Sequence, residues 1–260
     1  MVAYSAGWWT RRILDRAAGR WRRLAEAARR DGRVSEHLRD QARELQRDLA
    51  RYVQQADLRL TRARARLHTM VLPAGTDWRW RPAIFSAPMH AGAMTRPAPG
   101  CRLGDEVALY HDCAERALML RQLPNRHALD MSPFGLRLEV FGFTGSYLSL
   151  SLDLPAESRD GLDRGYVVRL EAGLLSERPI TVYARLNVGQ GPNTETMLFQ
   201  MGDPIGPDRT IRVTEFDLGF ADLANRAVDK MWLDLIFEAP QMNAVTVTDL
   251  VMSRHPRADM

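Results

Sequence analysis

The stretch LRLEVFGFTGSYLSLSLDL, residues 136–154, is the clearest indication of how this chain folds. Apolar side chains occupy every second position on both sides of a short link at Thr144–Gly145. Because successive side chains of a strand point to opposite faces, each half is expected to be a strand with one buried and one wetter face. A short glycine-containing link between two such runs indicates a β-hairpin. Its leucine face then needs further strands to cover it.

Strand signals recur through the rest of the chain at intervals near ten residues. The clearest is residues 180–188, where apolar residues alternate with Thr181, Tyr183, Arg185 and Asn187. The predicted strands are 105–111, 115–121, 136–143, 146–154, 164–175, 179–188, 194–201, 209–217, 231–238 and 244–253. The series predicts a mainly β protein, a jelly-roll-like antiparallel β-sandwich preceded by an N-terminal pair of α-helices. A helical interruption is expected at residues 220–229.

The start of the chain differs from the rest in both pattern and charge. Residues 8–30 have helical spacing, Asp31–Gly32 interrupts it, and Ser35 is placed to cap a second helix that runs to Leu67. Leucines three and four residues apart in that helix predict a coiled coil or a helical hairpin. The expected domains are a basic helical segment at 1–70, a proline-rich linker or wrapping loop at 71–102, and the β-sandwich domain at 103–260.

Residues 1–70 carry 17 arginines and eight acidic residues, whereas the net charge of the whole chain is only +4. The favoured interpretation is structural: the apolar seam contacts a second copy of the chain or another element, so the helices serve docking or oligomerisation. A contact with an anionic membrane surface through residues 1–30, which include Trp8–Trp9, is the second interpretation. Nucleic acid is disfavoured as a partner, because no DNA or RNA recognition motif accompanies the arginines.

Composition and motifs give little support for an enzyme. The two cysteines cannot form a disulfide framework, which fits a protein of the cytoplasm, with peripheral membrane association as the alternative location. No apolar run is long enough for a membrane-spanning helix. We find no nucleotide-binding, nucleophile-elbow or metal-ligand motif, and therefore expect no catalytic residue, no metal and no cofactor. A Cys113–His111 pair is interpreted as structural, since no third group is identified to orient the base.

The better candidate for function is a polar sheet face. Aromatic rings that stack on apolar sugar faces, together with carboxylates, amides and guanidiniums that bind hydroxyls, are typical of sites for polyols. The candidate ligand-binding residues are Tyr147, Tyr183, Arg185, Asn187, Asn193, Trp232 and Asp234. The loop 189–194 adds flexible backbone at a sheet end. The alternative is that these side chains form an ordinary solvated face or are covered by the N-terminal helices.

Two further sets of residues leave alternatives open. Trp78 and Trp80 share a strand face, so their rings cap the sandwich core or, less favoured, stack on sugars. A glycosidase needs two carboxylates about 5–10 Å apart. Glu139, Asp153, Glu171 and Asp234 are available for such a pair, but their strand positions alone do not single one out.

Several segments together are similar to a family of uncharacterised bacterial proteins that have a basic helical start and an all-β remainder. They are residues 77–82, 103–113, 121–126, 134–155, 184–195 and 231–258. The resemblance covers nearly the whole chain and implies a fold loosely similar to galactose-binding-like and carbohydrate-binding jelly-roll modules. It assigns no catalytic or binding residue.

These observations favour a non-catalytic β-sandwich module that binds a glycan or a protein, with carbohydrate as the leading ligand. The N-terminal helices would provide docking or homo-oligomerisation. The alternative is a structural adaptor at the inner membrane surface, anchored by the basic amphipathic N-terminus. A glycoside hydrolase-like enzyme is the third hypothesis.

Overall fold

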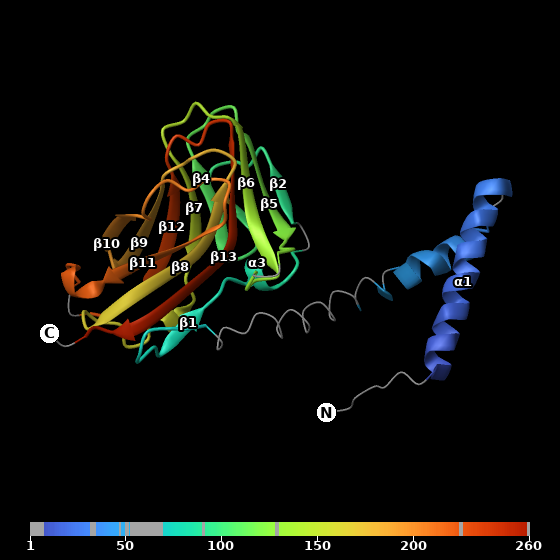
Figure 1. Ribbon diagram of the computed structural model, residues 1–260, viewed down its shortest axis with the longest axis horizontal. Coiled ribbons are helices and arrows are strands. Elements are labelled where there is room, and N and C mark those ends of the chain that lie inside the picture. Colours follow the sequence, from blue (N-terminus) through green and yellow to red (C-terminus); the bar gives the residue numbers. More distant parts are fainter. Residues whose placement is uncertain are drawn as a thin grey trace. The chain divides into compact units, whose positions relative to one another are not determined.

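The computed structural model describes residues 8–31, 35–46, 48–49, 52, 70–89, 92–127, 130–223 and 226–258. The chain divides into two compact units, Met1–Gln54 and Gln55–Met260. The first contains helices and the second is a β-sandwich (Figure 1).

The helical unit begins with α1, Trp8–Asp31, which ends where the sequence predicts. A second helix follows at residues 36–46. The Ser35 hydroxyl accepts a hydrogen bond of 3.4 Å from the backbone N–H of Leu38, as expected of an N-cap. The coiled-coil prediction extends to Leu67, but positions 53–69 lie outside the described residues. None of the described helices is both long and apolar enough to cross a membrane.

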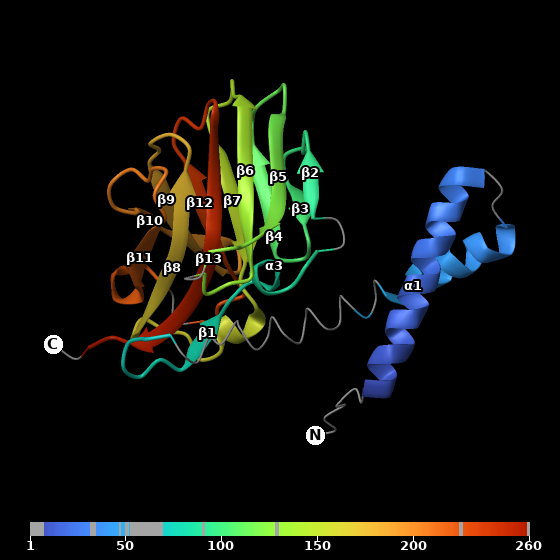
Figure 2. The ribbon, with the colours of Figure 1, turned by 45° about the vertical axis from the view of Figure 1, so that its right-hand side comes forward.

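The sandwich consists of two antiparallel sheets that lie face to face (Figures 1 and 2). In the described residues, sheet A has the order β11 (Thr210–Asp217), β8 (Tyr166–Ser176), β13 (Asn243–Pro256), β6 (Phe134–Gly142), β5 (Ala117–Pro124) and β2 (Ala93–Thr95), with β1 (Trp78–Trp80) also paired to β13. Sheet B has the order β10 (Asn193–Gln200), β9 (Val182–Gln190), β12 (Lys230–Phe237), β7 (Leu148–Asp153), β4 (Val107–His111) and β3 (Cys101–Leu103). Short helices are α3 (Ala83–Ser86), η2 (Ala156–Arg159) and η3 (Leu218–Phe220). The predicted jelly-roll-like sandwich is confirmed.

The core lies between the two sheets and is built from the alternating apolar positions. Leu148, Leu150 and Leu152 of β7 are at most 1% exposed, and Leu136 and Leu138 of β6 are also buried. Full burial of one such side chain contributes about 1.5–3 kcal/mol relative to leaving it in water. The sandwich therefore depends on both leucine faces being covered at once.

The hairpin predicted between β6 and β7 is wrong, because the two strands belong to different sheets. β6 pairs with β5 and β13, whereas β7 pairs with β4 and β12. Residues 143–147 carry the chain across from sheet A to sheet B. Alternation reports only that each strand buries one face, and a crossing between sheets satisfies that requirement as well as a hairpin does.

Asp112 holds this crossing in place from the end of β4. Its carboxylate accepts hydrogen bonds from the backbone N–H of Ser146 at 2.7 Å, from the Ser146 hydroxyl at 2.6 Å and from the N–H of Tyr147 at 3.2 Å. These bonds lower the pKa of Asp112 to about 2, and the bond from the Ser146 hydroxyl has the largest effect. A side chain at Gly145 would collide with the Asp112 carboxylate and with the backbone nitrogen of Cys113, so only glycine fits this link.

Residues 78–103 take part in both sheets. β1 pairs with β13, β2 with β5, and β3 with β4, although the sequence suggested a linker or a wrapping loop over 71–102. Strands of three residues are too short to show a period, so pattern alone misses them. Trp78 and Trp80 pack against the core, which confirms their predicted capping role.

Two local predictions in the second half of the chain are wrong. The described residues at 221–223 and 226–229 contain no helix, and only the turn η3 precedes them. The segment 189–194 is a tight hairpin rather than a flexible loop. Gln190 pairs with Asn193, and Gly191 supplies the positive φ of 65° that the turn requires.

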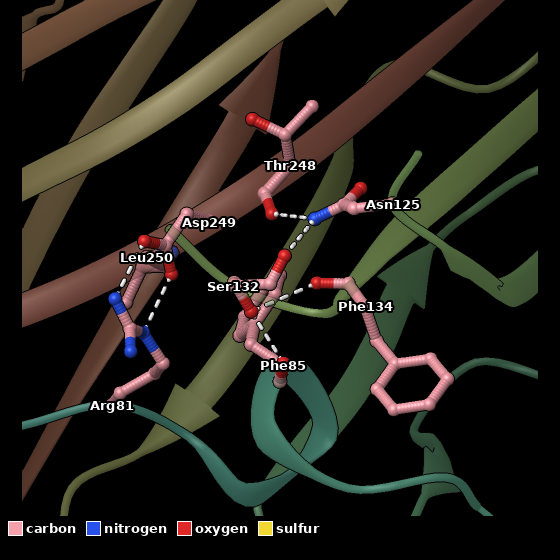
Figure 3. A network of polar contacts seen from close by, with 8 residues as sticks. All are labelled: Arg81, Phe85, Asn125, Ser132, Phe134, Thr248, Asp249 and Leu250. Carbon is pink, nitrogen blue, oxygen red and sulfur yellow. Dashed lines mark hydrogen bonds and ion pairs between the residues drawn. The ribbon is translucent and has the colours of Figure 1, made fainter. Parts of the chain in front are cut away.

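β13 changes its partner halfway along, and a buried polar network marks the change (Figure 3). It pairs with β6 up to Val247 and with β1 from Met252, and its register against β8 shifts between Val247 and Asp249. The Asn125 amide donates to the backbone carbonyls of Thr248, at 2.7 Å, and Ser132, at 2.8 Å. The bulge thus keeps hydrogen-bond partners although the ladder is interrupted.

Next to the bulge, Arg81 forms a buried ion pair with Asp249, also shown in Figure 3. The guanidinium donates two hydrogen bonds of 2.8 Å to the two carboxylate oxygens. The Arg81 side chain is 2% exposed and that of Asp249 is 10% exposed. The pair ties the segment after β1 to the centre of sheet A.

We expect the Asp112 contribution to stability to disappear in acid. A carboxylate whose folded pKa is below its ordinary value of 3.8 stabilises the fold above that pH, and this contribution is lost as pH falls toward about 2. Asp112→Ala should be less stable than the wild type at pH 7, and the difference should shrink between about pH 4 and about pH 2. Urea unfolding of both proteins across that range measures it. A difference that stays constant would contradict the assignment.

Removing one member of the buried ion pair should cost more than removing both. Asp249→Leu leaves the Arg81 charge buried without its carboxylate, which we expect to destabilise the fold by about 3–5 kcal/mol. The double variant Arg81→Met, Asp249→Leu should lose less stability, because it leaves no unpaired buried charge. Glu215→Gln, in the more exposed pair of Arg169 and Glu215, is the control and should cost less than about 1 kcal/mol. Denaturant unfolding measures the stability of all three variants. A double variant that is less stable than Asp249→Leu alone would refute the prediction.

Candidate functional site

The outer face of sheet B is hollowed into a groove of about 410 Å³. The same strands that bury leucines inward turn every second side chain outward, and these outward residues form the groove. Its lining is Arg102, Ala108, Tyr110, Tyr147, Ser149, Ser151, Asp153, Arg185, Lys230, Trp232, Asp234 and Ile236.

Small side chains explain why this face is concave. Ala108 of β4 pairs with Ser151 of β7, and Ser149 is two residues away on the same face of β7. All three are less than 9% exposed, so they form a low floor. Larger side chains surround this floor. Among them are Tyr110 of β4 and Trp232 of β12, the strand that pairs with the other side of β7.

One wall of the groove carries a preorganised polar cluster. Arg185 of β9 donates to the Asp234 carboxylate at 2.8 and 3.0 Å, and the Asn187 amide donates to the same oxygen at 2.9 Å. Asp234 is 3% exposed, so its charge needs these partners. The Arg185 side chain remains 41% exposed. The cluster therefore presents a partly exposed guanidinium whose orientation is fixed by its hydrogen bonds to the buried Asp234.

A second charged cluster lies toward the end of β7. Arg102 donates to Asp153 at 2.7 Å, and the Lys230 ammonium lies 3.6 Å from the other oxygen of that carboxylate. Lys230 also lies over the ring of Trp232, 4.9 Å from its centre. Because all these side chains are partly exposed, the cluster is adaptable, in contrast to the one around Asp234.

The structure brings most of the predicted ligand-binding residues together. Tyr147, Arg185, Trp232 and Asp234 line the groove. Asn187 lies beside it, bonded to Asp234. Two do not take part in the lining. Tyr183 pairs with Ile236 at the edge of the groove, whereas Asn193 pairs with Gln190, a core-side position of β9, and so faces away.

Tyr110, Arg102 and Lys230 are among the groove residues that sequence reasoning missed. Tyr110 alternates with the buried Leu109 and His111 in β4, so its outward position was readable from the sequence. Its place beside β7 was not, because neighbours in an antiparallel sheet need not be neighbours in the chain. Lys230, the only lysine, had no distinguishing pattern around it.

The Cys113–His111 pair has no catalytic geometry. The ring nitrogen Nδ1 of His111 accepts from the backbone N–H of Cys113 at 3.2 Å, and Nε2 lies 3.1 Å from the carbonyl oxygen of Pro97. The Cys113 sulfur instead lies 3.8 Å from Thr144 and from the Gly142 carbonyl. Both imidazole nitrogens are therefore engaged with backbone groups, as the structural interpretation expects.

The carboxylates considered for hydrolysis are separated and paired. Glu139 bonds Arg121 and Arg137 and Glu171 contacts Arg169 in sheet A, whereas Asp153 and Asp234 lie in the groove. Both groove carboxylates are held in the ion pairs described above. Within the described residues, no group of three or more histidine, cysteine or acidic side chains is arranged to hold a metal ion.

A larger open hollow of about 1180 Å³ lies between residues 156–165 and the segment that precedes β12. Its described lining contains arginines, aspartates, glycines and small apolar residues, with no aromatic ring. It lacks the combination of rings and fixed polar groups that the groove on sheet B offers. The groove is therefore the candidate binding site.

Comparison with solved structures finds proteins that are only distantly similar. The CBM22-1 xylan-binding domain from Paenibacillus barcinonensis is 12% identical with a TM-score of 0.40, over 72% of this chain and 100% of that one. A family 11 carbohydrate-binding module from Clostridium thermocellum is 8% identical with a TM-score of 0.38, over 62% and 95%. The enzymatically active domain of tailspike protein 4 from bacteriophage CBA120 is 9% identical with a TM-score of 0.41, over 56% of this chain and only 19% of that one. Likeness at this level transfers no ligand.

No curated protein matches the chain. The sequence profile of one protein family, however, matches it over residues 1–260, as the similarity of its segments predicts. The chain belongs to the family of unknown function DUF6478.

Proposed function

We propose that the groove on sheet B binds a neutral carbohydrate without cleaving it. The observation that carries the proposal is the small floor of Ala108, Ser149 and Ser151, set between exposed aromatic side chains and the fixed cluster of Arg185 and Asp234. Tyr110 and Tyr147 are 42% and 46% exposed, so ring surface is available to the C–H face of a sugar. Arginine, serine and carboxylate groups supply donors and acceptors for hydroxyls.

The charges of the groove favour a neutral ligand over an acidic one. Its three cations, Arg102, Arg185 and Lys230, are paired with Asp153 and Asp234. An acidic ligand would have to compete with carboxylates already in place. Hydroxyl groups instead bind to paired charges without displacing them, since both partners retain spare donors or lone pairs.

Binding rather than hydrolysis is proposed because no carboxylate of the groove is free. A general acid, a general base and a nucleophile each need a carboxylate oxygen that can reach the substrate. Arginine side chains already hold Asp153 and Asp234, which opposes all three roles. Asp234 is in addition almost fully buried.

Removing an aromatic ring from the groove should abolish most of the binding. Tyr147→Ala and Trp232→Ala remove stacking surface, and each should weaken affinity about tenfold or more, because buried Trp and Tyr contacts dominate binding energies. Screening a glycan array with the wild type identifies the oligosaccharide, and calorimetry with that oligosaccharide measures each variant. Phe141→Ala, an exposed ring on sheet A, is the matched control and should bind normally. No binding to any glycan, or equal binding by all variants, would reject the proposal.

Affinity for a neutral glycan should be nearly independent of salt. Between about 50 and about 500 mM NaCl we expect the dissociation constant to change by less than about twofold, because exposed charge pairs are screened but hydroxyl hydrogen bonds are not. Calorimetric titrations in both buffers measure the change. A loss of affinity of tenfold or more would identify an acidic ligand and contradict the neutral-ligand proposal.

A further inference from the structure

A second surface, independent of the groove, lies on α1. Its sequence contains eight arginines and three acidic residues in 24 positions. With 3.6 residues per turn, Leu14, Ala17, Trp21, Leu24 and Ala28 recur at steps of three and four and lie on one side of the helix together with Ile13. The helix is therefore amphipathic, with a narrow apolar side and a strongly basic remainder.

The two ends of the apolar side differ in how far they are covered. Trp21, Leu24 and Ala28, toward the C-terminal end, are partly buried, and so are Leu38 and Ala42 of the helix at 36–46. These positions are therefore better covered than the N-terminal end of the apolar side. Ile13 and Leu14, toward the N-terminal end, are 63% and 62% exposed. A branched apolar pair is thus left open on the first half of α1.

Arginines border the apolar side of α1 on both edges. At 100° per residue, Arg16 and Arg20 fall on one edge, near Ile13, and Arg22 and Arg29 fall on the other edge, farther toward the C-terminal end. All four side chains are exposed. Long arginine side chains in this position can lie along an apolar surface and keep their charges at its polar boundary. The matching partner is apolar in its interior and negatively charged at its surface.

We propose that the N-terminal half of α1 binds the surface of an anionic lipid bilayer, with Ile13 and Leu14 inserted and the flanking arginines against the headgroups. An interfacial helix is strongly amphipathic and has a polar face rich in Lys and Arg, as α1 does. Anionic headgroups attract basic residues near the membrane surface, which adds to the burial of the apolar pair.

Charge distinguishes this partner from two others. A second copy of α1 packed along the same side would bring arginine edges against arginine edges, and like charges across a helix pair are unfavourable. Nucleic acid would satisfy the arginines but would leave Ile13 and Leu14 in water. Of these three partners, only a bilayer of negative charge matches both the apolar pair and the arginines beside it.

The test is co-sedimentation of the full-length chain with vesicles. Phosphatidylcholine and phosphatidylglycerol in about a 2:1 ratio form the anionic probe, and pure phosphatidylcholine is the reference. We expect the wild type to bind the anionic vesicles at least about tenfold more strongly, and to be released at about 500 mM NaCl.

The variant Ile13→Ala, Leu14→Ala should reduce binding to anionic vesicles by about tenfold or more. Alanine has the highest helix propensity, so this variant removes apolar surface without weakening the helix, which circular dichroism verifies. The matched control is Ile211→Ala, Val213→Ala, two exposed apolar residues of β11 in the other unit, and it should bind as the wild type does.

Any of three results would overturn the proposal. The first is equal binding to anionic and neutral vesicles, and the second is binding that the Ile13, Leu14 variant leaves unchanged. The third is absence of vesicle binding; a dimer in solution that this variant converts to a monomer would then identify the surface as a contact between copies. None of these results affects glycan binding by the groove, which is measured separately.

Discussion

The structure depends on burying two leucine faces against each other. β6 and β7 follow one another in the chain, yet each belongs to a different sheet, and their leucines meet across the interior. A strand that buries one face necessarily exposes the other. The serines and the aspartate that alternate with the leucines of β7 are therefore fixed on the outside by the same burial that forms the core. The floor and one end of the groove on sheet B are the reverse side of that strand.

Buried carboxylates have two distinct uses in this molecule. Asp249 in sheet A pairs with Arg81, which is itself buried, so the contact holds the segment after β1 against β13 at the bulge. Asp234 in sheet B pairs with Arg185, whose guanidinium stays partly in water. The first pair is closed to solvent and stabilises the fold. The second has one open side and therefore leaves polar atoms available to a ligand.

The two proposed surfaces are chemically different and lie on different units. The groove combines small side chains, rings and paired charges, which suits an uncharged polar ligand. The open part of α1 combines a branched apolar pair with unbalanced positive charge, which suits a negatively charged bilayer. A chain with both surfaces would hold a glycan-binding module close to a membrane, although each surface is testable without the other.

The sequence alone identifies the longer strands and the faces that they bury. The period-two pattern located β6, β7, β9 and β13 closely, and it placed Arg185, Asn187, Trp232 and Asp234 on outward faces, because alternation is a property of neighbouring residues. The tertiary structure was needed to show that β6 and β7 lie in different sheets, that three-residue strands join the sheets, and that β4, β7, β12 and β9 are neighbours. Strand order depends on contacts between residues far apart in the chain, and no local pattern contains them. For the same reason, Tyr110 joined the groove and Asn193 did not.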